Sequence, residues 1–235
     1  MKKISVCMAT YNGGKYIKQQ IDSILIQLSE NDELIISDDN STDNTIDVIK
    51  GISDCRIKLF FNKEKGYTSN FENALNQVTG DIIFLSDQDD IWVSNKVEIC
   101  LEELKTYDFI VSDCKVINNK NEIISDSYFE LRNIKKTSLG NLIKFSFLGC
   151  CLAFRSDILK KALPFPSDRK LCTHDNWLFL VGALLFRYKV LNNKLIHYRR
   201  HTENVSTLIS KTSVWFKIKY RMYLSFFLIK RYIAN

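Results

Sequence analysis

The sequence is short of proline and lacks any long apolar run. It has only two prolines among 235 residues, and 46% of its residues are hydrophobic, which fits a globular protein with a core better than a disordered chain. No uncharged apolar stretch reaches about 18 residues, so no membrane-spanning helix is expected. The opening MKKISVCMATYN has too few apolar residues for the core of a signal peptide. We therefore predict a cytoplasmic protein built on one large α/β domain.

The sequence also lacks the cysteine spacing of a disulfide framework or a zinc site. Its seven cysteines are an odd number, no C-x-x-C pair occurs, and Cys150 and Cys151 are adjacent. We expect most of them to be small buried hydrophobic residues in a reducing cytosol.

Acidic side chains are missing from the C-terminal segment. Residues 211–235 hold six basic side chains and no acidic one, which leaves 27 basic and 27 acidic side chains in residues 1–210. A neutral body with a basic end argues against a general nucleic-acid binder and indicates a local basic surface.

Two glycine-rich phosphate-binding motifs are absent as well. Neither G-x-x-x-x-G-K-[ST] nor G-x-G-x-x-G occurs, so a cradle of backbone amides for a phosphate is not expected. A protein without such a loop can still hold a diphosphate through a divalent cation, which requires carboxylate oxygens.

Apolar segments and helix-like patterns alternate through the first half of the chain. An amphipathic helix follows each of the first three strands that we expect, and the strands lie at residues 4–9, 33–37, 56–61 and 82–86. We expect Ser41 or Thr42 to cap the second helix, and a capping box at Ser69–Glu72 to open the third. This order implies an α/β fold with a mostly parallel, Rossmann-like central sheet flanked by helices.

Carboxylates gather where the predicted strands end. The first strand ends at Thr10–Asn12, the second at Asp38 and Asp39, and the fourth at Asp87–Asp90. Because ligands bind beyond the carboxyl ends of the strands in such sheets, these residues should form one rim. Three acids in four positions repel each other unless a cation lies among them, so the D-x-D-D run predicts a divalent metal site. The alternative is a solvated loop between a strand and a helix.

A second acidic run, DDNSTDNT, has a weaker claim to a metal. Its spacing imitates the start of a calcium loop, but Asn44 replaces the glycine of the sixth position and Lys50 the glutamate of the twelfth. For Asp43, a turn with a helix N-cap remains the alternative.

Five segments in the same order resemble the family 2 glycosyltransferases, which are inverting enzymes of the GT-A fold. The segments are SVCMATYNGGKYI, IISDDNSTDNT, GDIIFLSDQDDIW, HDNW and YRRHTENVS, and the resemblance covers about residues 3–206. The form SDQDDIW is similar to bacterial rhamnosyltransferases and related surface-polysaccharide enzymes. Arg200 and Thr202 depart from the family, because many members have Gln and Gly there. The Gln-x-x-Arg-Trp motif of the processive members is absent, which implies addition of one sugar per encounter.

The resemblance implies roles for residues at the rim. Those expected to bind the nucleotide-sugar are Thr10, Tyr11, Asn12, Asp38, Asp39, Asp87 and His201. Among these, Asp39 would accept a hydrogen bond from the base, and Asp87 would contact the ribose or the sugar.

The resemblance also assigns the metal and the base. Asp89, alone or with Asp90, would ligate Mg²⁺ or Mn²⁺ on the diphosphate, and His201 would help to hold the metal or the diphosphate. Asp175 matches the catalytic base. His174 and His201 could instead be ordinary polar surface residues.

The implied function is transfer of a single sugar with inversion. The donor would be UDP- or dTDP-linked, the acceptor a saccharide or a lipid-linked saccharide, and the setting bacterial cell-surface polysaccharide biosynthesis. The alternatives are a metal-dependent nucleotidyltransferase or phosphohydrolase, and a catalytically inactive nucleotide-sugar-binding protein. Residues 1–206 would form the glycosyltransferase domain, with residues 1–92 as the nucleotide-sugar-binding half and 93–206 as the acceptor-binding half.

Residues 207–235 are expected to form a basic, aromatic helical tail. The helix would be apolar nearly all round, which is typical of a helix that is buried or lies in a lipid interface. Residues 211–235 would therefore pack on the body or on a second copy in a homodimer, or contact the anionic inner surface of the membrane.

Overall fold

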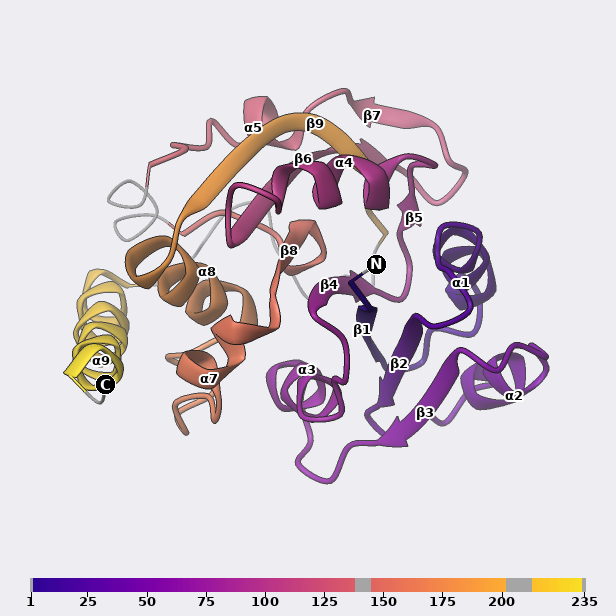
Figure 1. Ribbon diagram of the computed structural model, residues 1–235, viewed down its shortest axis with the longest axis horizontal. Coiled ribbons are helices and arrows are strands. Elements are labelled where there is room, and N and C mark those ends of the chain that lie inside the picture. Colours follow the sequence, from indigo (N-terminus) through magenta and orange to yellow (C-terminus); the bar gives the residue numbers. More distant parts are fainter. Residues whose placement is uncertain (1, 138–144, 202–212, 234–235) are drawn as a thin grey trace.

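The computed structural model describes residues 2–137, 145–201 and 213–233. In the N-terminal half, parallel pairing joins the first strand to the second and the fourth, and the second strand to the third. The predicted alternation of strands and helices is confirmed here (Figure 1). The bounds are β1 Ile4–Thr10, α1 Ile17–Leu25, β2 Glu33–Asp38, α2 Thr45–Lys50, β3 Ile57–Phe61, α3 Tyr67–Leu75 and β4 Ile82–Asp87.

The second half extends the same sheet with strands of both directions. The bounds are β5 Ile91–Trp92, α4 Lys96–Glu103, β6 Phe109–Ile117, β7 Ile123–Ser125, α5 Tyr128–Leu131, η1 Gly149–Cys151, β8 Leu152–Arg155, η2 Ser156–Ile158, α7 Leu159–Ala162, α8 His174–Leu185 and β9 Tyr188–Arg199. Strand β8 runs antiparallel to both β4 and β6, and β9 runs parallel to β6 but antiparallel to β5.

The described residues form one curled sheet of nine strands. The order is β3-β2-β1-β4-β8-β6-β9-β5, and β7 pairs with β6. Because β8 joins β4 to β6, the predicted nucleotide and acceptor halves share a single sheet, and their division stays a prediction. The boundary at residue 206, together with Thr202 and Lys211, lies outside the described residues. Strand β9 is a long curved strand that pairs with β6 along its length and with β5 near its end, which brings that end beside the loop of the D-x-D-D run (Figure 1).

Apolar side chains of the strands make one continuous core with the inner faces of the helices. All seven cysteines belong to the described residues. Six of them are buried, only Cys55 is exposed, and none forms a disulfide. The expectation that most cysteines are small buried residues is thus confirmed.

Both predicted helix caps are wrong. Helix α2 begins at Thr45 without a side-chain cap, because the Ser41 hydroxyl accepts the backbone N–H of Asn12 instead, at 2.9 Å. Helix α3 begins at Tyr67, so the Ser69–Glu72 segment lies inside it. The Glu72 carboxylate accepts the backbone N–H of Phe165 instead, at 2.5 Å. In both places a tertiary hydrogen bond takes the side chain that the local pattern assigned to the cap.

Helix α9, Val214–Ile233, lies beside α8 at the edge of the molecule (Figure 1). One face packs on the body through Leu224, which is fully buried, and through Tyr220, Tyr223, Phe227 and Leu228. The other face is exposed and apolar, and consists of Val214, Trp215, Ile218, Met222, Phe226, Ile229, Tyr232 and Ile233. Among the described helices, none combines the length and the apolar character needed to cross a membrane.

Candidate active site

The carboxyl ends of β1, β2 and β4 meet at one rim, as the sequence predicts. Their register places Asp38 opposite Thr10, and Asp87 opposite Ala9. The Thr10 hydroxyl donates to Asp38 at 2.9 Å, and Asp38 also accepts the backbone N–H of Ser41 at 2.7 Å. Asp38 is fully buried, so in this structure it holds the turn after β2 against the end of β1.

Asp39 is the first residue after β2. One carboxylate oxygen accepts from the Asn62 side chain, and the other accepts the backbone N–H of Gly66, both at 2.9 Å. These bonds fix the orientation of the carboxylate while leaving each oxygen a second lone pair. A nucleobase N–H could use such a lone pair, and this role of Asp39 stays a prediction.

The loop after β1 is held by a side chain that sequence reasoning missed. Gln88 accepts from the N–H of Tyr11 and donates to its carbonyl oxygen, both at 2.9 Å. Gly13 leaves the space for this contact, since a Cβ there would meet Gln88 Oε1 at 2.2 Å. The Tyr11 ring is left 45% exposed at the rim. An exposed aromatic ring on a fixed backbone is suited to stacking on a base.

Asn12 and Asp43 join the same loop to the loop after β2. Asn12 adopts a left-handed backbone with φ of 48°, and its side chain accepts the N–H of Thr42 at 2.8 Å. Asp43 accepts the N–H groups of Gly14 and Thr45, at 3.1 and 3.0 Å. These bonds support the turn interpretation of DDNSTDNT and give Asp43 a local structural role.

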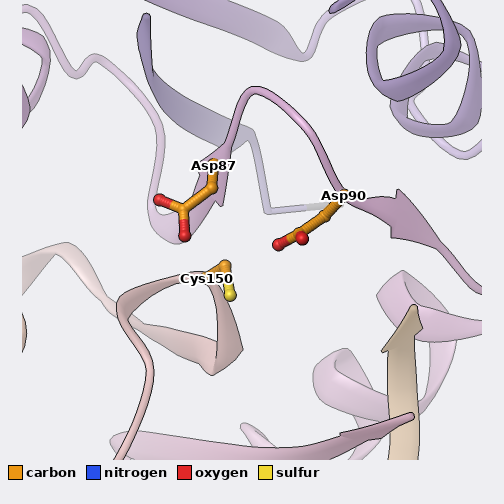
Figure 2. A group of neighbouring side chains, drawn as sticks. All are labelled: Asp87, Asp90 and Cys150. Atoms are coloured by element: carbon orange, nitrogen blue, oxygen red, sulfur yellow. The ribbon is translucent and has the colours of Figure 1, made fainter. Parts of the chain in front are cut away.

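Two of the three acids of the D-x-D-D run lie near Cys150, and the third lies against His201. Asp87 ends β4 and faces the rim, whereas Asp90 is fully buried and accepts the Arg199 N–H at 2.9 Å. Asp89 Oδ2 lies 2.7 Å from His201 Nε2. Figure 2 shows Asp87 and Asp90 gathered above Cys150 of η1. One ligand atom of each of these three residues lies within 4.8 Å of the others.

The acids at the rim act on each other electrostatically. Burial raises the pKa of Asp87 to about 7, and the negative charges of Asp89 and Asp175 add to this effect. Burial likewise raises the pKa of Asp90 well above its ordinary value, with the charges of Asp89 and Asp87 contributing. A raised pKa of this kind marks carboxylates that have too little positive charge around them.

Arg199 fastens the end of β9 to this loop. Its Nε donates to the Asp89 carbonyl oxygen at 2.7 Å, and its guanidinium lies 4.7 Å from the centre of the Tyr16 ring. The Tyr16 ring in turn lies 5.3 Å from the His201 ring. The resemblance pointed to the surrounding Y-R-R-H segment but assigned no role to Arg199.

The structure brings Asp175 to the rim although it follows Asp87 by nearly 90 positions in the chain. It is the second residue of α8, whose N-terminus has a capping box formed by Thr173 and Asn176. Asp175 accepts from the Thr173 hydroxyl and, at 2.8 Å, from the Asn176 N–H. The pKa of Tyr67 is raised first by burial and then by the negative charge of Asp175. The Asp175 carboxylate therefore lies close to the Tyr67 ring as well.

His174 is not a surface residue. Its ring stacks on Phe71 with the centroids 4.0 Å apart, and burial lowers its pKa. Gly149 makes room for it, because a Cβ at that position would meet His174 Nε2 at 2.4 Å. Neither ring nitrogen has a hydrogen-bond partner in the described part of the chain. This packing wedges the start of α8 between α3 and η1.

A model of the family described as "Glycosyl transferase family 2" matches residues 5–163, more than half of the chain. The chain belongs to family 2 of the glycosyltransferases. This membership confirms the resemblance and argues against the nucleotidyltransferase and phosphohydrolase alternatives.

Several curated relatives have assigned activities, among them WfgD and RfbG. The chain is 32% identical over 180 residues to WfgD of Escherichia coli, a UDP-Glc:α-D-GlcNAc-diphosphoundecaprenol β-1,3-glucosyltransferase, covering 75% of this chain and 68% of WfgD. It is 29% identical over 238 residues to RfbG of Shigella flexneri, a dTDP-rhamnosyl transferase, covering 91% of this chain and 77% of RfbG. The chain spans about two thirds of the length of the first curated relatives that it matches.

The fold is the GT-A fold. Residues 1–349 of TarS from S. aureus, in complex with UDP-GlcNAc, match with a TM-score of 0.70 at 18% identity, covering 99% of this chain and 73% of that chain. The likeness confirms the predicted fold class, with the sheet pairing described above.

Proposed function

We propose that this chain transfers a single sugar, with inversion, from a UDP- or dTDP-linked donor to a saccharide or lipid-linked acceptor. The observation that carries the proposal is the approach of Asp175, on α8, to Asp87, whose loop also carries the Asp89–His201 pair. Sugar transfer requires a base for the acceptor hydroxyl on one side of the sugar ring and cation ligands for the donor diphosphate on the other side.

The nucleoside would lie over the loops after β1 and β2. Tyr11 offers its exposed ring to the base, and Asp39 offers the lone pairs left over from its bonds to Asn62 and Gly66. Thr10 and Asp38 lie beneath, and Asn12 fixes the loop backbone. Asp87 faces the ribose or the sugar. Because the Tyr11 backbone is held by Gln88, these groups are in place before the donor arrives.

Asp89 and His201 fit a divalent cation such as Mg²⁺ or Mn²⁺. Their Oδ2 and Nε2 atoms are 2.7 Å apart, they come from two different segments, and both are types of metal ligand. When bound, the cation would neutralise the charge that develops on the departing nucleoside diphosphate. Asp90, which could join Asp89 as a ligand, is fully buried and already accepts the Arg199 N–H, so we place the cation on Asp89 and His201.

Asp175 would act as the base. Its Oδ1 accepts from Thr173 and from the Asn176 N–H, so its orientation is set by the capping box of a rigid helix. The carboxylate would take the proton of the acceptor hydroxyl as that oxygen attacks the anomeric carbon, and the sugar–phosphate bond breaks on the opposite face. Displacement from the opposite face inverts the anomeric configuration.

The names of the relatives support the substrate class. WfgD is named for a UDP-sugar donor and a diphosphoundecaprenol-linked acceptor, and RfbG for a dTDP-sugar. We extend both classes to this chain and place its reaction in cell-surface polysaccharide biosynthesis, on the cytoplasmic side of a membrane.

Helix α9 would hold the protein at that membrane. The same helix carries basic side chains beside its exposed apolar face, among them Lys217, Lys219 and Lys230. A helix with an apolar face and basic flanks is suited to the interface of an anionic leaflet, where a lipid-linked acceptor resides. A second copy of the chain on the same face is the competing outcome.

The direct test of the proposed function is a panel of nucleotide sugars. With Mn²⁺ present, we expect UDP- or dTDP-sugars to raise the melting temperature more than GDP-sugars, because a ligand of the native state stabilises it. The donor that binds should then give a product with a diphosphate-linked acceptor, and its anomeric configuration should be opposite to that of the donor. Binding without any transfer would show an inactive nucleotide-sugar-binding protein.

A further inference from the structure

Helix α5 ends at a basic side chain that has no counter-ion. Arg132, the C-cap of α5, is partly buried, and its Nε atom is buried without a hydrogen-bond partner. No hydrogen bond or ion pair links its side chain to another of the residues that the structure describes. By contrast, Lys136 donates to Asn192, and Lys115 pairs with Asp126 at 3.0 Å. Because burying a charged donor without a partner is unfavourable, Arg132 indicates that an anionic ligand binds here.

The start of α5 is fixed, which gives Arg132 a defined position. Ser127 caps the helix by accepting the Glu130 N–H at 3.1 Å, and its hydroxyl donates to Asp113 of β6 at 2.6 Å. Asp113 also accepts the Phe129 N–H at 3.1 Å. Asp113 is therefore the anchor of the helix and not the counter-ion of the guanidinium.

Tyr128 places α5 beside the rim. It is buried, and its ring meets the Tyr198 ring edge-on with the centroids 5.9 Å apart. Tyr198 precedes Arg199, which holds the loop of the D-x-D-D run. Burial raises the pKa of Tyr128, the charge of Arg132 opposes this rise, and Cys150 of η1 is near enough to add to it. The Tyr128 hydroxyl therefore keeps its proton beside the guanidinium and can donate to the same ligand.

The short helix η1 lies between this pair and the proposed base. On one side, a Cβ at Gly149 would lie 3.6 Å from the Cβ of Asp175. On the other side, Cys150 lies near Tyr128. An acceptor with its hydroxyl at Asp175 would extend along η1 and bring its far end to Arg132.

We propose that Arg132 and the Tyr128 hydroxyl bind the diphosphate of a lipid-diphosphate-linked acceptor. The inference rests on the proposed function and specifies how the anionic end of the acceptor is recognised. A guanidinium presents its N–H groups as a fixed fork that matches phosphate oxygens, and the hydroxyl adds one further donor. A phospholipid headgroup and free phosphate offer the same oxygen atoms, so the experiment separates these sources.

The test measures binding of decyl diphosphate, which has the anionic group and a short alkyl chain but no sugar, by calorimetry. UDP and Mn²⁺ are present in excess, so that the donor site is filled. We expect Arg132→Gln to weaken this binding by about tenfold or more, as loss of a charge-assisted hydrogen bond does. Arg132→Lys should weaken it by about threefold, because lysine keeps the charge but not the fork. Tyr128→Phe should weaken it by about fivefold.

The matched control is Arg187→Gln, which removes the same charge from an exposed side chain just before β9, at the opposite end of that strand from Arg199. It should bind decyl diphosphate as the parent does. Decyl glucoside, which has the same chain without the charge, should bind the parent and Arg132→Gln equally. Inorganic phosphate should bind the parent at least about tenfold more weakly than decyl diphosphate. Phosphatidylglycerol vesicles should bind the parent and Arg132→Gln alike.

Melting temperatures show whether each variant is folded, and if Arg132→Gln is not, Arg132→Lys decides. The inference is overturned if the folded Arg132 variant binds decyl diphosphate as tightly as the parent, or if Arg187→Gln loses as much. It is also overturned if the dependence on Arg132 is equally large for inorganic phosphate or for the vesicles.

Sugar transfer is assayed on the same samples. Transfer by the parent, with binding of decyl diphosphate independent of Arg132, would overturn this inference and leave the proposed function standing. Binding that depends on Arg132, without transfer to any acceptor, would support the anion site and contradict the proposed function.

Discussion

Hydrogen bonds from single side chains fix the positions of the loops at the rim. Gln88 holds Tyr11 by both of its backbone groups, and Arg199 holds the Asp89 carbonyl. The candidate residues were predictable because strand ends in a parallel sheet share one edge, and the motifs mark those ends. Their partners were not predictable, because Gln88, Arg199 and Cys150 act through contacts with residues distant in the sequence.

Gly149 and His174 should be energetically coupled. A Cβ at residue 149 would meet His174 Nε2 at 2.4 Å, and the His174 ring is wedged against Phe71, so it cannot easily move away. We expect Gly149→Ala to destabilise the fold by about 1–3 kcal/mol, as overpacking does. In the His174→Ala background the same change should have little effect. Urea unfolding of the two single variants and the double variant measures the coupling. Additive changes in the free energy of unfolding would contradict this contact.

Elements of the N-terminal half are held in register by buried polar groups as well as by apolar packing. Glu33 at the start of β2 accepts from Ser5 of β1 at 2.5 Å and from Lys58 of β3 at 2.6 Å. The alternating pattern of strands and helices was readable from the sequence because their apolar spacing differs. The caps of α2 and α3 were not, because Ser41 and Glu72 bond to Asn12 and Phe165, which are distant in the sequence.

The Glu33 carboxylate should make stability depend on acid. Burial alone would raise its pKa, but hydrogen bonds from Lys58, Ser5 and Thr79 outweigh it and lower the pKa from 4.5 to about 2. Its ionised form therefore stabilises the fold above pH 4.5, and this contribution is lost as the pH falls through about 2. We expect Glu33→Gln to reduce the free energy of unfolding by about 2 kcal/mol at pH 6, after allowance for solvent screening, and much less near pH 2. Denaturant unfolding across this range measures it, and a difference independent of pH would refute the assignment.

Helix α9 presents an outward face that the described residues leave uncovered. Trp215 and Phe226 are 80% and 64% exposed, so their replacement removes no core contact. We expect the double change Trp215→Ser and Phe226→Ser to reduce flotation with anionic liposomes by about tenfold, and salt to weaken the binding of the parent chain. The matched control is Ile26→Ser, which removes an equally exposed apolar side chain at the end of α1. Equal flotation of all three proteins would exclude membrane contact through α9, and a concentration-dependent dimer would assign the face to a second copy.

At the scale of the whole molecule, one sheet brings two distant segments to a single rim. The resemblance indicated that Asp175 belongs with Asp87 and Asp89, but no periodicity of the sequence shows how. The antiparallel insertion of β8 between β4 and β6 provides the route, because it places η1 and the start of α8 beside the end of β4. The sequence pattern loosens after residue 112, where the strands become mixed in direction, and this arrangement was therefore not predicted.

The central claim is that Asp175 removes the acceptor proton, and Asp175→Asn tests it most directly. Asparagine keeps the Oδ1 acceptor for Thr173 and Asn176 but cannot take a proton at pH 7. The transfer rate and the donor dissociation constant are measured on the same samples, beside Asp157→Asn, a change to an exposed carboxylate at the opposite end of β8. We predict that Asp175→Asn slows transfer by about 10²- to 10⁴-fold with nearly unchanged donor affinity, and that Asp157→Asn changes neither. Transfer by the Asp175 variant at the parent rate would contradict the account.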